Sequence, residues 1–295
     1  MNPSITTESP DLKGPGPIET DVAERPLTIM RPPGTRLTID WREIWRYREL
    51  LYFLAIPDIK VRYKQTAIGV AWVVLQPIVS TAILSVLFSA FARFDTRDVP
   101  YPLFALSGSL LWLFCHSSIT MSSNSFIGNT NLVTKVYFPR LIMPVASTLS
   151  CVLDLLIGLA ILVGLMTYYQ AVPNWQLAAA PVFLFLAFLL AAAIGSLFSA
   201  LNVRYRDVQF ALPFLLQIWM LASPIFYPTT LLPEKWKLIF AVNPLAGILE
   251  GFRSSLFGTA FEWKMIGISC ISLLLLIVIS LLVFRKMEDD FADMI

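Results

Sequence analysis

The sequence has few charged residues for its length. Only 14% of its 295 residues are Asp, Glu, Lys or Arg, whereas 57% are hydrophobic and the mean hydropathy is +0.70. Soluble domains are about 25% charged, so this composition excludes an ordinary water-soluble fold and indicates an integral membrane protein. The net charge of +2 is small, and we therefore expect no general attraction to nucleic acid.

Side chains that bind metals or form disulfides are also scarce. Cys115, Cys151 and Cys270 lie inside apolar runs without paired spacing, and His116 is the only histidine. This pattern argues against a disulfide or metal framework. Neither G-x-x-x-x-G-K-[ST] nor G-x-G-x-x-G occurs, so the phosphate-binding glycine motifs are missing. We expect no catalytic residue, metal or cofactor in this chain, with any ATP and Mg²⁺ bound by a separate subunit.

Internal repeats and a cleavable signal peptide are not visible either. The missing repeat argues against an inverted-repeat secondary transporter. Residues 1–35 contain seven prolines and mixed charge without an apolar core. They are predicted to be a disordered cytoplasmic tail, so that the first apolar run serves as the uncleaved membrane signal.

A basic segment joined directly to an apolar run marks a membrane surface within Asp58–Pro77. Before it, Asp40–Ile56 carries tryptophans on one helical face and arginines on the other, and Pro57 is expected to end this helix. The pattern favours an amphipathic helix lying flat at the bilayer interface, with a helix of a soluble domain as the alternative. Residues 36–70 are thus predicted to form an interface helix and a basic collar.

Six apolar runs follow, most of them near the 20 residues that cross a hydrocarbon core. They give a transmembrane domain over 71–286, followed by an acidic cytoplasmic tail at 287–295. Segments expected inside hold thirteen Lys and Arg residues, against six in segments expected outside. This asymmetry places both termini in the cytoplasm. The predicted spans are 71–91, 103–119, 141–168, 177–201, 210–226 and 265–284.

The connection between the last two runs is too apolar for a solvated loop, yet prolines divide it into pieces too short to span. Lys235–Val242 and Leu245–Leu256 are predicted as short helices, and residues 228–258 as a re-entrant pair at a pore. A hairpin lying on the outer surface is the alternative. The predicted fold class is an all-α integral membrane protein with six transmembrane helices, an N-terminal amphipathic interface helix and two short re-entrant outer helices.

Polar residues inside apolar runs are candidates for function. Asp154 is the only acidic residue near the middle of a predicted span. It either lines a pathway or is protonated and hydrogen-bonded to a neighbouring helix. Glu250 and Arg253 lie one helical turn apart and are expected to form an ion pair. Gly247 and Gly251 have the spacing that permits close approach of another helix.

Aromatic residues make up 13% of the chain and are frequent in its outer half. Interfacial belts explain many of them. The alternative is a passage in which aromatic rings stack on the sugar rings of a sliding polymer. On that hypothesis the candidate channel-lining residues are Phe88, Phe91, Trp112, Asp154 and Tyr227.

Several segments, in order, resemble the membrane-spanning (permease) subunits of ABC transporters that export bacterial cell-surface polysaccharides of the O-antigen, capsule or teichoic-acid type. The similarity covers about residues 38–286, and the first 35 residues match no pattern of that family. The segments that carry it are Asp58–Pro77, Lys135–Arg140, Leu201–Asp207, Ser223–Pro228, Asn243-Pro244 and Glu250–Arg253.

The resemblance implies a homodimer in the cytoplasmic membrane, associated with two copies of an ABC ATPase subunit. It implies a lipid-linked polysaccharide substrate, with O-antigen expected, moved through a channel between the two copies. The short outer helices would form an outer gate at Trp236, Glu250 and Arg253. Contacts with the ATPase would involve Trp41, Arg42, Arg46, Lys135, Tyr137, Arg140, Arg204, Tyr205, Arg206 and Asp207.

Three other functions remain open from the sequence. An ABC permease for drugs or small lipids would share the topology but need no aromatic path. A membrane-embedded lipid-modifying enzyme would require clustered carboxylates, histidines or a metal motif, and none is found. A proton-driven carrier would require a relay of buried acids, whereas Asp154 stands alone.

Overall fold

The computed structural model describes residues 46–64, 69–91, 99–135, 138–171, 174–231, 233–288 and 291. All of them lie in one compact unit, residues 39–295. Helices dominate this part of the chain, and no strand occurs within it, which confirms the all-α fold class for the described residues. The predicted tail at residues 1–35 and the start of the interface helix lie outside the described residues.

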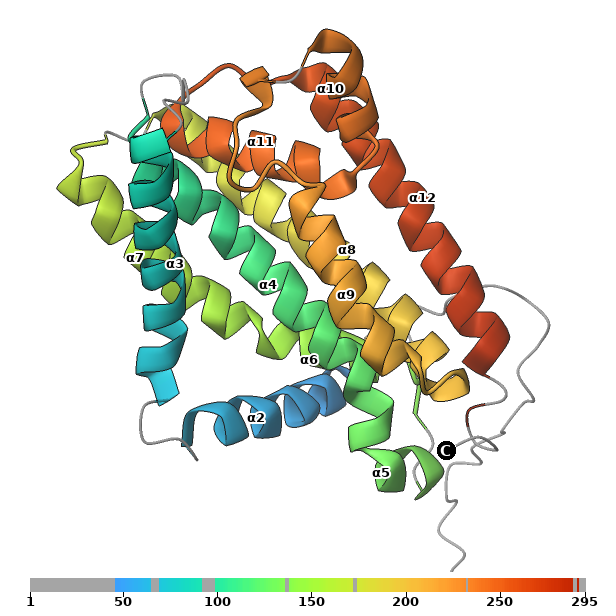
Figure 1. Cartoon of the computed structure of the whole chain (residues 1–295). Helices are drawn as coiled ribbons and strands as arrows, with labels where there is room; N and C mark the ends of the chain where they lie inside the picture. The colour runs from blue at the N-terminus through green and yellow to red at the C-terminus, as the bar shows by residue number, and fades with distance from the viewer. Residues whose placement is uncertain are drawn as a thin grey trace, which may run out of the picture. The chain divides into compact units, whose positions relative to one another are not determined.

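The described helices follow one another with short connections, and Figure 1 shows their arrangement. In chain order they are α2 (Arg48–Lys64), α3 (Gly69–Phe91), α4 (Tyr101–Gly128), α5 (Thr130–Lys135), α6 (Ile142–Ser150), α7 (Val152–Tyr168), the 3₁₀ helix η1 (Trp175–Ala179), α8 (Ala180–Arg204), α9 (Val208–Leu221), the 3₁₀ helix η2 (Thr229–Leu231), α10 (Glu234–Ala241), α11 (Pro244–Phe257) and α12 (Trp263–Glu288).

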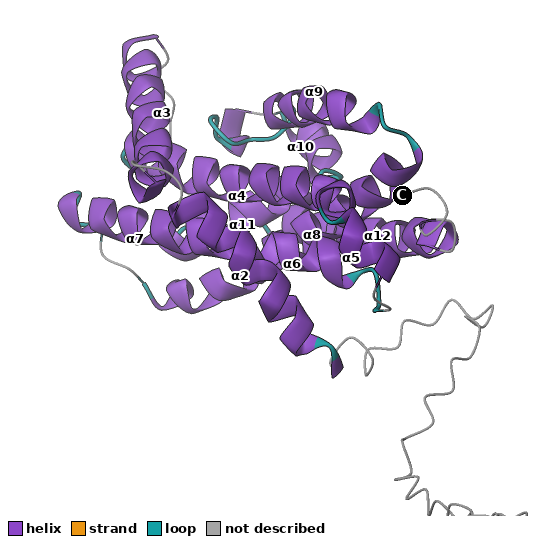
Figure 2. Ribbon diagram, turned by 90° about the horizontal axis from the view of Figure 1, so that it is seen from below, coloured by secondary structure: helices purple, strands orange, loops and turns teal. Residues whose placement is uncertain are grey.

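Helix α4 lies at the centre of the unit and packs against α3, α6, α7, α8, α9 and α11. Figure 2 shows α3 and α9 on the same side of α4. Small side chains along α4 permit this close packing. The Ser122 hydroxyl donates to the Pro144 carbonyl of α6 at 2.8 Å, and Gly195 of α8 lies directly opposite Ser122. Because both contacts need small residues, the sequence of α4 fixes how near its neighbours can lie.

Within the described residues, four helical stretches are long and apolar enough to cross a membrane, which makes the chain a multi-pass membrane protein. They are Tyr101–Gly128, Ile142–Tyr168, Trp175–Arg204 and Trp263–Glu288. They coincide with the predicted spans 103–119, 141–168, 177–201 and 265–284. The other two predicted spans correspond to shorter described apolar stretches, Val74–Ile83 in α3 and Val208–Leu221.

Helix α9 is too short to cross a bilayer by itself. Its 14 residues give about 21 Å at 1.5 Å per residue, whereas the hydrocarbon core is about 30 Å thick. The predicted span 210–226 is therefore wrong as a continuous helix, because the chain leaves helical geometry after Leu221 and runs on irregularly to Pro228. This irregular segment, residues 222–228, is part of the candidate site below.

The long stretch Ile142–Tyr168 is interrupted at Cys151, between α6 and α7. Hydroxyl groups just before the interruption bond to backbone carbonyls of their own helix. Thr148 Oγ1 donates to the Pro144 carbonyl at 3.0 Å, and Ser150 Oγ donates to the Ser147 carbonyl at 2.8 Å. Such bonds bend helices. The predicted span 141–168 is thus present as two helices that meet at Cys151.

The expected end of the interface helix at Pro57 is wrong. Helix α2 continues through Pro57 to Lys64 and includes the basic residues of the predicted collar. Proline lacks an N–H, so it cannot bond to the carbonyl of Phe53 one turn earlier. Both Phe53 and Pro57 are exposed, and a surface carbonyl can find a partner in the solvent. The helix therefore tolerates the proline.

The two ends of the described chain lie at the same end of the unit (Figure 1). A hydrophobic cluster, here called the lower cluster, joins them. It comprises Phe126, Phe138, Met143, Ala200, Val203, Phe284, Met287 and Phe291, with Tyr47, Leu50 and Leu54 of the α2 region packed against it. Helices α10 and α11 lie at the opposite, upper end (Figure 1). They match the two short helices predicted at Lys235–Val242 and Leu245–Leu256.

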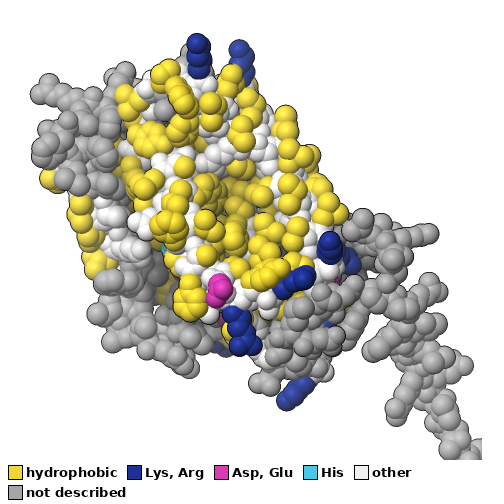
Figure 3. Space-filling model, turned by 45° about the vertical axis from the view of Figure 1, so that its right-hand side comes forward, with side chains coloured by type: hydrophobic (Ala, Val, Ile, Leu, Met, Phe, Trp, Pro, Cys, Tyr) yellow, Lys and Arg dark blue, Asp and Glu magenta, His cyan; other side chains and the backbone are white. Residues whose placement is uncertain are grey.

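Exposed apolar side chains cover the middle of the unit. On one face, hydrophobic side chains occupy the centre while lysine and arginine side chains lie at the two ends (Figure 3). Exposed large hydrophobic residues occur throughout α9 and α12, for example Phe214, Ile218, Leu274 and Val278. A band of this kind is what hydrocarbon contact requires.

Candidate functional site

The irregular segment after α9 is held by side chains from other elements. Irregular backbone at membrane depth must find hydrogen-bond partners within the protein. Arg253 of α11 supplies two of them: Nη1 donates to the Pro224 carbonyl at 2.7 Å, and Nη2 donates to the Ile225 carbonyl at 2.5 Å. Tyr101 Oη donates to the next carbonyl, that of Phe226, at 3.0 Å. Three successive carbonyls are thus bound.

Arg253 also contacts the first turns of α4. Nη2 donates to the Phe104 carbonyl at 3.2 Å and Nε donates to Ser107 Oγ at 3.4 Å. Its guanidinium carbon lies 3.6 Å from the centre of the Phe104 ring, a cation–π contact. The side chain is 4% exposed, so its charge is removed from solvent. A rigid fork of donors suits this geometry because it can bond several oxygens at once.

A second polar network joins the end of α9 to the start of α11. The Asn243 carboxamide oxygen accepts from the Leu245 N–H at 3.1 Å, which caps α11, and from Trp219 Nε1 at 3.0 Å. Asn243 Nδ2 donates to Ser223 Oγ at 2.8 Å, and that hydroxyl donates to the Trp219 carbonyl at 2.8 Å. Because one side chain serves both helices, their ends are fixed relative to each other.

Glu250 lies one turn before Arg253 on α11, and it is also buried. Its Oε2 accepts a hydrogen bond from Thr229 Oγ1 of η2 at 3.1 Å. The expected ion pair between Glu250 and Arg253 is not what positions the guanidinium, whose donors all reach oxygens of residues 104–107 and 224–225. The opposite charge of Glu250 on the same helix face still favours the buried cation.

Three glycines permit these contacts. A Cβ at Gly108 of α4 would overlap both the Arg253 guanidinium and the Ile225 carbonyl. On α11, Gly247 lies against Ser269 of α12, and Gly251 lies against the ring of Phe183 of α8. The predicted close approach at Gly247 and Gly251 is therefore confirmed, and it involves two different helices of the same chain.

Aromatic candidates for the channel lie in different surroundings. Trp112 is buried on α4, with its ring centre 5.5 Å from that of Trp219 in an edge-to-face arrangement and 5.9 Å from that of His116. Tyr227 is half-buried, and its ring meets Phe240 of α10 edge-to-face at 6.5 Å. Trp236 of α10 is 56% exposed. The side chains of Phe88 and Phe91 lie outside the described residues.

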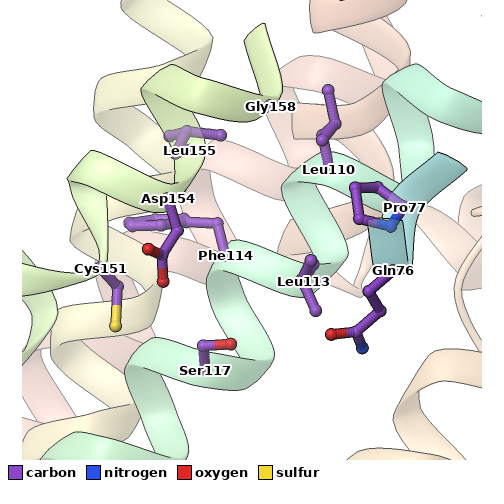
Figure 4. A pocket seen from close by; sticks show the side chains of 10 residues that line it. All are labelled: Gln76, Pro77, Leu110, Leu113, Phe114, Ser117, Cys151, Asp154, Leu155 and Gly158. Carbon is purple, nitrogen blue, oxygen red and sulfur yellow. The ribbon is translucent and has the colours of Figure 1, made fainter. Parts of the chain in front are cut away.

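Asp154 lies in the first turn of α7, directly after the interruption at Cys151. It borders a cavity of about 70 Å³, enough for a few water molecules. Figure 4 shows Asp154 beside Phe114 on one side of this cavity, Gln76 on the opposite side, and apolar side chains such as Leu110 between α3 and α7. The Tyr63 hydroxyl of α2 donates to the Asp154 carboxylate. Asp154 thus bonds to a neighbouring helix.

The predicted ATPase-contact residues differ in their surroundings. Arg140 is half-buried: its guanidinium donates to the Glu288 carbonyl at the end of α12 and lies 5.7 Å from the centre of the Phe291 ring. The other predicted ATPase-contact residues that the structure describes have exposed side chains. In the sequence they lie within a few positions of residues of the lower cluster. Trp41, Arg42 and Tyr137 lie outside the described residues. The exposed group is Arg46, Lys135, Arg204, Tyr205, Arg206 and Asp207.

Sequence reasoning assigned no role to four residues that complete the site at the outer end, although two of them lie in segments that carry the family resemblance. They are Tyr101, Gly108, Ser223 and Asn243. One of them had a local signal, because asparagine followed by proline before an apolar run is typical of a helix start. The other three contact residues more than a hundred positions away or across a helix end, which no local pattern encodes.

Together these contacts form an internally hydrogen-bonded junction between α4, α9, α11 and the irregular segment 222–228. Within the described ranges, no three His, Cys, Asp or Glu side chains are grouped as a metal site would need. What the junction can do is hold irregular backbone at the upper end of the membrane band.

A multi-pass helical unit with such a junction fits a transporter subunit. Comparison with known families identifies the family to which the chain belongs. Residues 49–257 match the model of the ABC-2 type transporter membrane family, and the chain belongs to that family.

The names of similar proteins specify what those proteins transport. The chain is 27% identical over 248 residues to the O-antigen export system permease protein RfbA of Klebsiella pneumoniae, covering 84% of this chain and 95% of that protein. It is 25% identical over 259 residues to RfbA of Myxococcus xanthus, covering 86% and 98%. It is 24% identical over 251 residues to the polysialic acid transport protein KpsM of Escherichia coli, covering 80% and 92%.

Proposed function

We propose that this chain is the permease subunit of an ABC exporter that moves lipid-linked cell-surface polysaccharide, namely O-antigen, out of the cytoplasm. The observation that carries the proposal is the similarity to RfbA proteins over almost their whole length, 95% and 98%. Membership of the ABC-2 family supports a transporter rather than an enzyme. The energy comes from ATP, which a separate subunit binds with Mg²⁺ and hydrolyses.

The proposed topology has six spans: the four long helical stretches, α3, and α9 together with the irregular segment 222–228 that follows it. An even number agrees with the common location of α2 and the end of α12 at the lower cluster. The excess of Lys and Arg in segments at that end supports a cytoplasmic location for both termini. Helices α10 and α11 then lie at the outer end, as a re-entrant pair that forms the outer gate with Trp236, Glu250 and Arg253.

The proposed assembly is a homodimer with two ATPase subunits in the cytoplasmic membrane. Six spans in one copy have little room for a sugar-wide path, whereas two copies around a twofold axis can enclose one. The exposed apolar faces of the unit are consistent with contacts to lipid and to a second copy. The exposed cationic residues near the lower cluster, from Arg46 to Asp207, would contact the ATPases, so that ATP-driven closure moves the helices as rigid units.

Deletion of the gene in its source bacterium tests this function. We expect surface polysaccharide to disappear and undecaprenyl-linked glycan to accumulate inside the cell, because synthesis continues while export stops. Expression of the intact chain should restore surface glycan. Normal surface glycan together with loss of resistance to drugs would contradict the proposal and favour a small-molecule exporter.

A further inference from the structure

The two short helices at the outer end differ sharply in how they are attached. In α11, all twelve residues from Leu245 to Leu256 are buried. In α10, by contrast, Ala241 is the one buried side chain among those described, while Leu238 is 55% and Ile239 is 60% exposed. One helix therefore belongs to the interior of the unit, and the other lies on its surface.

Polar contacts fix α11 in three directions. Arg253 bonds it to α4 and to the irregular segment after α9, and Glu250 bonds it to η2 through Thr229. Ser269 Oγ of α12 accepts from the Gly247 N–H at 3.1 Å, and Gly251 lies against Phe183 of α8. A shift of α11 would separate these buried donors from their acceptors, and each buried polar group left unsatisfied destabilises the shifted state.

The described contacts of α10 differ along its length. Its Lys237 lies 3.9 Å from Glu262 in a partly exposed ion pair, which contributes little to stability. Ser269 Oγ donates to the Ala241 carbonyl at 2.8 Å, at the very end of the helix. Its start, after Pro233, has no side-chain cap. The buried hydrogen bond described for α10 lies at the end next to Asn243, whereas Lys237 and Phe240 make their contacts at half-buried positions, so residues 242–243 are the candidate pivot.

We propose that Arg253 is a positioning residue that keeps α11 fixed to the helix unit, and that α10 is the part of the outer end that moves during export. This inference rests on the proposed export function and specifies its outer gate. The fixed frame consists of α11, the first turns of α4 and residues 223–229. Helix α10 pivots at 242–243 and opens the outer end while the frame keeps its internal hydrogen bonds.

Cross-linking of matched pairs tests the proposal in cells that carry the full chain and its partner ATPase. The background has Cys115, Cys151 and Cys270 replaced by Ala and must export glycan before treatment. One variant, Lys237→Cys/Glu262→Cys, ties α10 to the start of α12. The matched control, Gln176→Cys/Thr259→Cys, ties the end of α11 to η1, where the Gln176 amide lies 3.1 Å from the Thr259 carbonyl oxygen. Both pairs receive a short, reducible bis-methanethiosulfonate reagent.

Cross-linking of α10 should lower the export rate of newly made glycan at least tenfold. Chemical reduction of the cross-link should restore that rate. Cross-linking of α11 should change export less than twofold. Unchanged export with α10 tied, or loss of export with α11 tied, overturns the proposal. Both of these results leave the proposed export function intact, because the untreated cells still export glycan. Absence of glycan export in untreated wild-type cells would instead overturn the proposed function.

A labelling experiment separates positioning from general stability. In the cysteine-free background, Ser255→Cys on α11 and Ser118→Cys on α4 are both fully buried. With Arg253 present, neither should react with a water-soluble maleimide during export. With Arg253→Lys, the cysteine at 255 should become reactive and the one at 118 should stay protected. If both cysteines became reactive in Arg253→Lys, or if neither did, the result would contradict a positioning role for Arg253.

Discussion

Arg253 shows how one charged residue becomes tolerable inside an apolar protein. Its guanidinium reaches the carbonyls of Phe104, Pro224 and Ile225 and the face of the Phe104 ring, so each part of the cation has a partner. The Pro224 and Ile225 carbonyls need the guanidinium in turn, since the chain leaves helical geometry after Leu221 and these two carbonyls have no α-helical donors. Charge and irregular backbone therefore stabilise each other.

Replacement of Arg253 should destabilise the protein severely. Arg253→Met keeps an apolar side chain of similar length but leaves the Pro224 and Ile225 carbonyls without this donor. At about 1–3 kcal/mol for each unsatisfied buried group, we expect a loss of about 2–6 kcal/mol. Thermal unfolding of the purified protein in detergent measures it.

Arg253→Lys is the matched control for this substitution. It keeps the charge but cannot bond several oxygens in the same planar geometry, so the loss should be intermediate. A Met variant as stable as the wild type would show that the carbonyls find other donors.

Gly108 makes room for the same guanidinium. Gly108→Ala would place a Cβ onto Arg253 and onto the Ile225 carbonyl, neither of which can move freely. We expect destabilisation of about 1–3 kcal/mol, as for other overpacked interiors. Gly164→Ala in α7 is the control, because a Cβ there has no neighbour within 4 Å. It should be neutral or stabilise the helix by up to about 1 kcal/mol. Equal unfolding temperatures for both variants would refute the steric explanation.

At the scale of elements, the lower cluster joins segments that the sequence separates widely. The rings of Phe126, Phe284 and Phe291 pack together, with the centres of Phe126 and Phe291 5.0 Å apart. Arg140 covers this group by bonding to the Glu288 carbonyl at the end of α12. A cation is favourable at a helix C-terminus, where carbonyls lack partners. Arg140 therefore has a structural role in addition to its predicted contact with an ATPase.

Arg140→Ala should loosen the end of α12. Without the bond to the Glu288 carbonyl and the cation–π contact, amide hydrogen exchange at residues 284–288 should accelerate by about tenfold, equivalent to about 1.4 kcal/mol. Mass spectrometry of the exchanging protein in detergent measures this. Arg204→Ala serves as the control, because the Arg204 side chain is exposed over Tyr205 and should leave α12 unaffected. Unchanged exchange in Arg140→Ala would mean that the aromatic packing alone holds α12.

At the scale of the whole molecule, topology decides which surface meets which partner. Helix α2 and the end of α12 share the lower cluster, while α10 and α11 lie at the other end (Figure 1). The lower end therefore carries both described chain ends and the exposed loop residues between α8 and α9. The upper end carries the fixed junction of α11.

Cysteine labelling should reveal the orientation. Lys135→Cys at the end of α5 and Lys264→Cys at the start of α12 are both exposed, at opposite ends of the helix unit. In spheroplasts, a membrane-impermeant maleimide should modify the cysteine at 264 directly and the one at 135 only after the membrane is opened. The reverse pattern would invert the proposed topology, and labelling of both in intact spheroplasts would contradict any arrangement with these ends on opposite sides.

The sequence by itself determined the class of the protein and most of its elements. Long apolar runs with few charges can be stable only in a bilayer, and this predicts helices at 103–119, 177–201 and 265–284 wherever they pack. The prolines between the last two long runs likewise located α10 and α11 to within a residue or two. These features depend on local chemistry, which a sequence states directly.

Only the tertiary structure decided what the polar residues do. Glu250 and Arg253 looked like partners because they are one turn apart, yet Arg253 bonds to carbonyls about 30 and 150 positions away. The interruption at Cys151 and the passage of α2 through Pro57 likewise depend on which neighbours and surfaces surround those residues. A buried donor takes whichever acceptor the packing brings near, and packing is a property of the whole chain.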